Sequence, residues 1–116
     1  MRMPPIMALG LLLAMPAQAQ TAKIVGLGAS TCADFHREIA GSPGVERDYF
    51  AWAQGFMSGA LIRAPKGIDE GVDLSPRSFA LSEQAGFLRR FCRDNPDQDF
   101  MDAVRALYHR LRGLHA

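Results

Sequence analysis

The feature that most constrains this chain is an export leader joined to a short body with two cysteines. Arg2 precedes an apolar run at residues 6–14, and Ala17-Gln18-Ala19 forms a small-residue cleavage signal, so residues 1–19 are typical of a signal peptide. Cleavage after Ala19 would place residues 20–116 in an oxidising compartment, which we expect to be the periplasm. Such a compartment favours a disulfide between Cys32 and Cys92, the two cysteines of the sequence.

A mature chain of this length makes one domain with a modest core. A disulfide that closes a loop of about 60 residues contributes on the order of 4 kcal/mol in the chain-entropy account. The total stability of such a domain is about 5–15 kcal/mol. The disulfide is therefore expected to supply a large share of the stability.

The charge balance limits the classes of partner that the chain is expected to bind. The 13 Lys and Arg include Arg2, so leader cleavage leaves as many basic side chains as the 12 Asp and Glu. Binders of nucleic acid or of anionic membranes need a basic excess, which argues against both functions. No apolar run beyond the leader approaches the roughly 20 residues needed to span a bilayer. We therefore expect a mature chain without a stable membrane span.

Helical periodicity and turn signals predict an all-α fold, a small four-helix domain over residues 30–116 stapled by one disulfide. Residues 20–29 are small and lack periodicity, and are expected to be a flexible N-terminus. No stretch alternates as a half-buried strand does. The expected helices cover residues 32–40, residues 45–63, the segment from 75 to the Asn95-Pro96 break, and the segment from there to about residue 112.

Capping signals and apolar stripes support these bounds. Thr31 with Asp34 has capping-box spacing, and Ser75-Pro76 reads as an N-cap followed by proline at the first helical position. The turn Gly41-Ser42-Pro43-Gly44 separates the first two helices. Core contacts are expected from Cys32, Phe35, Ile39, Tyr49, Trp52, Ala53, Phe56, Met57, Ala60, Ile68, Val72, Leu74, Leu81, Ala85, Leu88, Cys92, Phe100, Val104, Leu107, Leu111 and Leu114.

Cys32 and Cys92 both fall on core-facing stripes, as a bridge between packed helices requires. The alternatives are two buried free thiols or a metal site. A metal site is disfavoured because the two cysteines have no histidines nearby at ligand spacing.

The apolar face of the second helix covers about half of its cylinder, which is wider than one small core usually needs. We expect Phe50, Met57 and Leu61 to form a partner-binding surface that Phe87 extends. That surface would bind a protein partner, unfolding client proteins or a second copy in a homodimer. The alternative is that the other helices cover it completely. Gly55 and Gly59 are expected to let another segment of the chain approach the helix closely.

Four aspartates gather where the fourth helix begins, and there they would complement the helix dipole. A calcium loop would also need a glycine turn and a terminal glutamate, which this segment lacks. Protonation would remove both charge complementarity and capping, so we expect a pH-sensitive cluster formed by Asp94, Asp97, Asp99 and Asp102.

The sequence gives no support to a catalytic site. His36, His109 and His115 are isolated from one another, and no serine lies in a nucleophile-elbow pattern. We therefore expect a non-catalytic protein with no cofactor and no metal.

Three segments of the chain form a pattern. They are a Cys-x-Asp-Phe start, a Trp-x-x-Gly-Phe helix and a Cys-x-x-Asn-Pro junction followed by a C-terminal helix. In this chain they read Thr31-Cys32-Ala33-Asp34-Phe35, Trp52-Ala53-Gln54-Gly55-Phe56-Met57-Ser58-Gly59 and Cys92-Arg93-Asp94-Asn95-Pro96. Together they resemble the HdeA/HdeB family of small periplasmic acid-stress chaperones.

The resemblance implies a disulfide-stapled helical fold, a homodimer at neutral pH, and loosening in acid to hold unfolding clients. A second group, the Tai/Rap-type immunity proteins that neutralise secreted toxins, is similar in size, leader and helix pattern, but typically has additional cysteines. Two functions follow as hypotheses. One is a holdase for many clients, and the other is an inhibitor of one partner.

Overall fold

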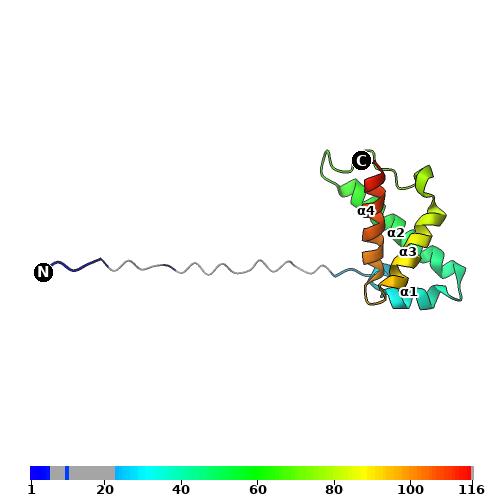
Figure 1. Ribbon diagram of the computed structural model, residues 1–116, viewed down its shortest axis with the longest axis horizontal. Coiled ribbons are helices and arrows are strands. Elements are labelled where there is room, and N and C mark those ends of the chain that lie inside the picture. The colour runs from blue at the N-terminus through cyan, green and yellow to red at the C-terminus, as the bar shows by residue number, and fades with distance from the viewer. Residues whose placement is uncertain (6–9, 11–22, 116) are drawn as a thin grey trace.

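The computed structural model describes residues 1–5, 10 and 23–115. Over these residues the chain is all-α, as expected (Figure 1). Apart from Gly10, the apolar run at 6–14 and the cleavage signal at 17–19 lie outside the described residues. The helices are α1 Cys32–Ile39, α2 Pro43–Arg63, α3 Leu81–Asp94 and α4 Phe100–His115, with short 3-10 helices η1 Leu27–Ala29 and η2 Arg77–Phe79.

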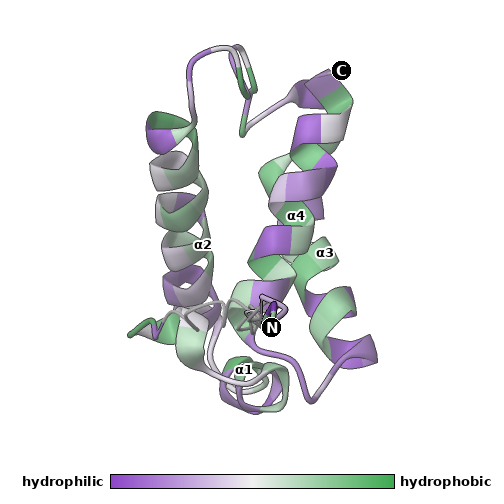
Figure 2. Cartoon of the chain, turned by 90° about the vertical axis from the view of Figure 1, so that its left-hand side faces the viewer, coloured by the Kyte–Doolittle hydropathy of each residue, from purple (hydrophilic) through white to green (hydrophobic). Residues whose placement is uncertain are grey.

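The helices enclose one core. α1 crosses one end of the domain, α2 stands on one side, α3 and α4 stand on the other, and the α2–α3 connection spans the opposite end (Figure 2). The rings of Phe35, Tyr49 and Phe100 meet near α1, with centroids 4.8–4.9 Å apart. Ala103, Val104, Leu107 and Leu111 continue the core along α4, and all are essentially unexposed.

The expected disulfide forms between the first residue of α1 and the last turn of α3. Cys32 and Cys92 are fully buried, with Cα atoms 4.6 Å apart. Within the described residues neither is a free thiol. The bond joins two elements separated by 60 positions at the point where α1 and α3 pack.

Backbone hydrogen bonds join the start of α1 to the segment that leads into α4. Thr31 caps α1 as expected, because its Oγ1 accepts a hydrogen bond from the N–H of Asp34 at 3.0 Å. The first two N–H groups of α1 donate to carbonyls of the loop before α4. The N–H of Cys32 donates to Gln98 at 2.7 Å, and the N–H of Ala33 donates to Pro96 at 3.2 Å. The loop that contains Asp97 and Asp99, two of the four clustered aspartates, is thereby held against α1.

Two helix starts differ from the expected ones. α2 begins at Pro43 rather than at 45, because Ser42 is its N-cap and proline tolerates the first turn. α3 begins at Leu81 rather than at 75–76, since Pro76 and Ala80 are both extended and η2 lies between them. The expectation that Ser75 caps α3 was therefore wrong.

Gln84 is the reason that α3 and the preceding connection stay together. Its side chain is fully buried, and its Nε2 donates to the carbonyls of Leu74 at 2.9 Å and Phe79 at 3.1 Å. Phe79 is itself buried, which pulls η2 toward the core. Leu81, expected in the core, is 41% exposed instead.

Two further apolar residues that we expected in the core are largely exposed. Ile68 in the α2–α3 connection is 49% exposed and Leu114 near the end of α4 is 43% exposed. Leu74 does pack against the core, so it contributes to anchoring the connection.

The N-terminal segment before α1 is part of the fold from Gly26 onward. The described part of the expected flexible segment 20–29 includes η1, which packs against α2 and α4. A Cβ on buried Gly28 would lie 2.0 Å from Cη2 of Trp52, so only glycine fits there. η1 therefore forms a packed cover on Trp52 within the segment that we expected to be flexible. Residues 20–22 of that segment lie outside the described residues.

Gly55 and Gly59 do not serve the close approach that we expected. A Cβ built on either glycine meets no atom within 4 Å, and Gly55 is exposed. Their small size is therefore not required by packing within the described residues. None of the helices described is both long enough and apolar enough to cross a membrane.

Candidate protein-binding groove and carboxylate contacts

A groove of about 350 Å³ lies between residues 43–50 of α2 and residues 82–89 of α3. α2 and α3 each pack against α1 and α4, and the groove lies between them. Directly beneath its floor lies a small recess against Phe35, Tyr49 and Phe100 of the aromatic core. The residues that line the groove are Pro43, Glu46, Arg47, Phe50, Ser82, Ala85 and Arg89.

The groove combines an apolar floor with a charged rim. Phe50 is half-buried and packs against the core from the floor. Arg89 reaches across from α3 to form an ion pair with Glu46 of α2. The backbone carbonyl of Arg89 lies 2.9 Å from Nε2 of His36, which ties this part of α3 to α1. Arg47 is exposed and makes no ion pair with a described residue.

The structure separates the four residues that we expected to form one partner surface. Phe50 lies in the groove. Met57 is only 1% exposed, so it belongs to the core and not to a surface. Leu61 is half-buried in the last part of α2, and Phe87 is half-buried and contacts the ring of Phe79, with centroids 6.3 Å apart. Neither Leu61 nor Phe87 lines the groove.

The most connected carboxylate in the described residues is Asp69 in the α2–α3 connection. Its Oδ2 accepts from the hydroxyl of Tyr108 at 2.8 Å, and its Oδ1 accepts from Nε of Arg112 at 2.5 Å. Its backbone is left-handed at φ 61°, which is uncommon for a residue with a side chain. These contacts fix the connection to the last turns of α4.

The same contacts set the protonation of Asp69. The hydrogen bond from Tyr108, with a smaller contribution from Arg112, holds the pKa of the Asp69 carboxyl below its ordinary value, against the opposing effect of burial. Burial, followed by the hydrogen bond to Asp69, raises the pKa of Tyr108. The ionised carboxylate is thus the form that this site favours.

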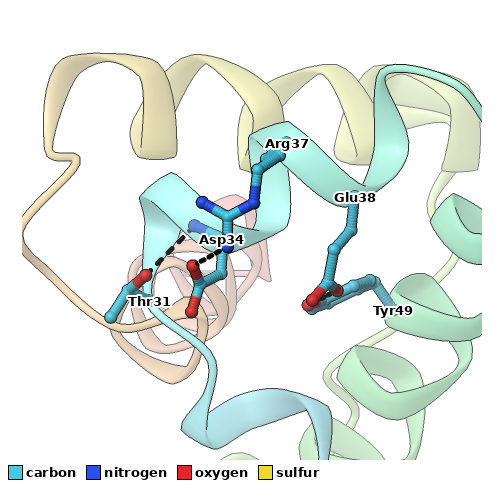
Figure 3. A network of polar contacts seen from close by, with 5 residues as sticks. All are labelled: Thr31, Asp34, Arg37, Glu38 and Tyr49. Atoms are coloured by element: carbon cyan, nitrogen blue, oxygen red, sulfur yellow. Dashed lines mark hydrogen bonds and ion pairs between the residues drawn. The ribbon is translucent and has the colours of Figure 1, made fainter.

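A second carboxylate joins α1 to α2. The hydroxyl of buried Tyr49 donates to Glu38 at 2.5 Å, and the two side chains point toward one another (Figure 3). Burial, and then this hydrogen bond, raise the pKa of Tyr49. At the start of α1, the hydrogen bond from Arg37 lowers the pKa of Asp34, and hydrogen bonds with Thr31 lower it further by a smaller amount.

The four clustered aspartates have different surroundings. Asp102 caps α4, since its Oδ2 accepts from the N–H of Asp99 at 3.0 Å. Asp94 pairs with its neighbour Arg93 at 3.2 Å, and Asp97 is exposed. Of the four carboxylates, that of Asp102 therefore serves the start of α4, while Asp99 contributes its backbone N–H. Whether the cluster responds to pH remains a prediction.

Two of the three isolated histidines share one open pocket. His109 and His115 line a pocket of about 450 Å³ with Asp69 and Arg112, and the ring of His115 lies against Gly71. No group of three or more histidine, cysteine or acidic side chains within the described part of the chain is placed to hold a metal ion.

Sequence reasoning missed Asp69 because its partners are distant. Tyr108 is 39 positions away and Arg112 is 43 positions away, and no local pattern links them. The one local signal was the neighbouring turn glycines Gly67 and Gly71, both left-handed at φ 84° and 78°. They indicate a tight connection, though not which side chain fastens it.

No family model, curated protein or solved structure matches this chain.

Proposed function

We propose that this chain is an exported, non-catalytic protein-binding domain that acts in the periplasm as an acid-stress holdase. This is the activity that the resemblance to the HdeA/HdeB family implies. The fold supports the proposal through the way in which it is held together. Acid does not break the disulfide, whereas several contacts between elements depend on ionised carboxylates.

The observation that carries the proposal is the Asp69 contact together with the Cys32–Cys92 bond. Protonation of Asp69 removes the ion pair with Arg112 and weakens the hydrogen bond from Tyr108, so the connection loses its attachment to α4. The disulfide still joins α1 to α3 under the same conditions. Acid would therefore loosen packing while the chain stays linked, and apolar side chains would become available to unfolding clients.

The net charge acts in the same direction. Protonation of the 12 carboxylates leaves the Lys, Arg and His side chains unopposed, and the resulting repulsion favours an expanded state. Expansion in acid is common among proteins, so it does not by itself distinguish a chaperone. The distinguishing property is the capture of many different clients.

The alternative is an immunity or inhibitor protein that neutralises one secreted toxin or enzyme. The groove beside Phe50 favours it, because an apolar floor with a charged rim suits one defined partner at neutral pH. The two functions differ in the number of partners and in the pH at which they bind.

A capture experiment from periplasmic extract separates the two. The oxidised, tagged mature chain is incubated with extract at pH 7 and at about pH 3, and bound proteins are identified by mass spectrometry. The holdase predicts many proteins, bound in acid and released at pH 7. One protein bound at pH 7, with no further proteins gained in acid, would reject the holdase in favour of the inhibitor.

A further inference from the structure

We propose that the α2–α3 groove docks a segment of a partner polypeptide that places an apolar side chain against Phe50 and a carboxylate against Arg47. This binding belongs to the folded protein at neutral pH, where the partner's carboxylate is ionised. It therefore goes beyond the acid-stress function and does not depend on it.

The apolar half of the site is preformed. Phe50, Ala85 and Pro43 give the groove a floor and a wall without hydrogen-bonding side chains. Phe50 is held from below by the aromatic core, so it does not need to be ordered when the partner binds. Preorganisation of this kind reduces the entropic cost of binding.

The charged half of the site selects an acidic segment. Three charged side chains line the groove, and two of them, Glu46 and Arg89, neutralise each other across it. Arg47 remains as the uncompensated charge of the lining, because it has no ion-pair partner among the described residues. Charge complementarity therefore calls for a carboxylate on the occupant.

The helix starts add to the same preference. The lining includes Pro43 and Glu46 in the first turn of α2 and Ser82 in the first turn of α3, where the helix dipole is positive. α3 begins after Ala80, whose side chain offers no acceptor for the first N–H groups of the helix. An acidic occupant that reaches Ser82 would meet these groups, whereas a basic one would meet the positive end of the α3 dipole and the charge of Arg47.

The test uses two short acetylated and amidated peptides, with the oxidised mature chain at pH 7. One peptide alternates leucine with aspartate, and the matched peptide has asparagine in place of every aspartate. Binding is measured by anisotropy of a dye on the peptide. We expect the acidic peptide to bind about two- to fivefold more tightly than the neutral one at low salt, as exposed charge pairs allow.

Variants locate the binding in the groove. Phe50→Ser should weaken both peptides by about tenfold, since it removes the apolar anchor. Arg47→Gln should make the two peptides bind equally. Arg63→Gln, at the other end of the same helix, should leave the preference for the acidic peptide intact. Circular dichroism confirms that each variant is folded.

Two results would overturn the inference. One is the failure of the acidic peptide to bind at concentrations up to about 1 mM, which corresponds to only about 4 kcal/mol of affinity. The other is a preference for the acidic peptide that persists in Arg47→Gln. If neither peptide binds and the chain sediments as a dimer that Phe50→Ser dissociates, a second copy occupies the groove. The holdase is tested in acid on unfolded clients, so its failure is distinguishable from these outcomes.

Discussion

At the scale of single residues, Asp69 is the side chain whose charge matters most to the connections between elements. Its folded-state pKa is lowered from the ordinary value of 3.8, so it stabilises the fold above that value. The contribution is lost as the pH falls through the folded-state pKa. Acid should therefore release the α2–α3 connection from α4 once the pH falls through this range.

The matching prediction concerns Asp69→Asn. Asparagine tolerates the left-handed backbone, so the substitution removes the charge and leaves the turn intact. We expect a lower Tm than wild type at pH 7, with a difference that shrinks as the pH falls below about 3.8. Thermal unfolding followed by circular dichroism at several pH values measures this.

Asp48→Asn is the control for Asp69→Asn, since Asp48 is exposed, has no ion pair within the described residues and lies outside the aspartate cluster. Its Tm should stay close to wild type throughout. An Asp69→Asn protein that is as stable as wild type at pH 7 would show that this contact does not hold the connection.

At the scale of elements, the prediction for η1 is that Gly28→Ala destabilises the domain. The new Cβ would overlap the indole of Trp52, and overpacking of this kind costs about 1–3 kcal/mol or more. In a domain of this size each kcal/mol lowers Tm by about 4–8 °C. Since Trp52 is the single tryptophan of the chain, its fluorescence also reports whether η1 still covers it.

Gly41→Ala serves as the matched control for Gly28→Ala, because a Cβ at Gly41 meets nothing within 4 Å. If Gly28→Ala unfolds at the wild-type temperature with unchanged fluorescence, η1 does not pack on Trp52 as described.

The opposite effect is expected at Gly55 on the exposed side of α2. Alanine has room there and favours the helix by about 0.5–1 kcal/mol, so Gly55→Ala should raise Tm by several degrees. Thermal unfolding of the isolated variant measures the gain. A fall in Tm would mean that another chain packs closely against Gly55.

The helices could largely be read from the sequence, because their caps and stripes are local. Thr31, the apolar stripe of α2 and the Asn95-Pro96 break act within a few residues of their own position. The start of α3 could not be read in this way. Ser75-Pro76 suits an α-helix and a 3-10 turn equally, and burial of Phe79 and the hydrogen bonds of Gln84 decide between them.

The residues of the candidate site show the same difference between local and distant signals. Phe50 was identified from the excess width of the apolar stripe of α2, and it does lie in a groove. Met57 was assigned to the same surface because a helical wheel does not show how deeply a neighbouring helix packs. Arg47 and Asp69 were missed, since their roles depend on which distant elements meet them.

At the scale of the whole molecule, one end of the domain is held by a covalent bond and the other by an ionic contact. The disulfide joins α1 and α3 at one end of the domain, and the Asp69 contact fastens the connection near the other end. Acid is expected to open the second end first. An intact disulfide would then limit how far the chain expands.

The most direct test of the central claim is the aggregation of a client protein in acid. Light scattering of an acid-denatured client is followed at about pH 2–3 and at pH 7, with oxidised mature chain, reduced and alkylated chain, or neither. The account predicts that the oxidised chain suppresses aggregation in acid, has no effect at pH 7, and protects less well once reduced. Equal aggregation in acid with and without the oxidised chain would contradict it.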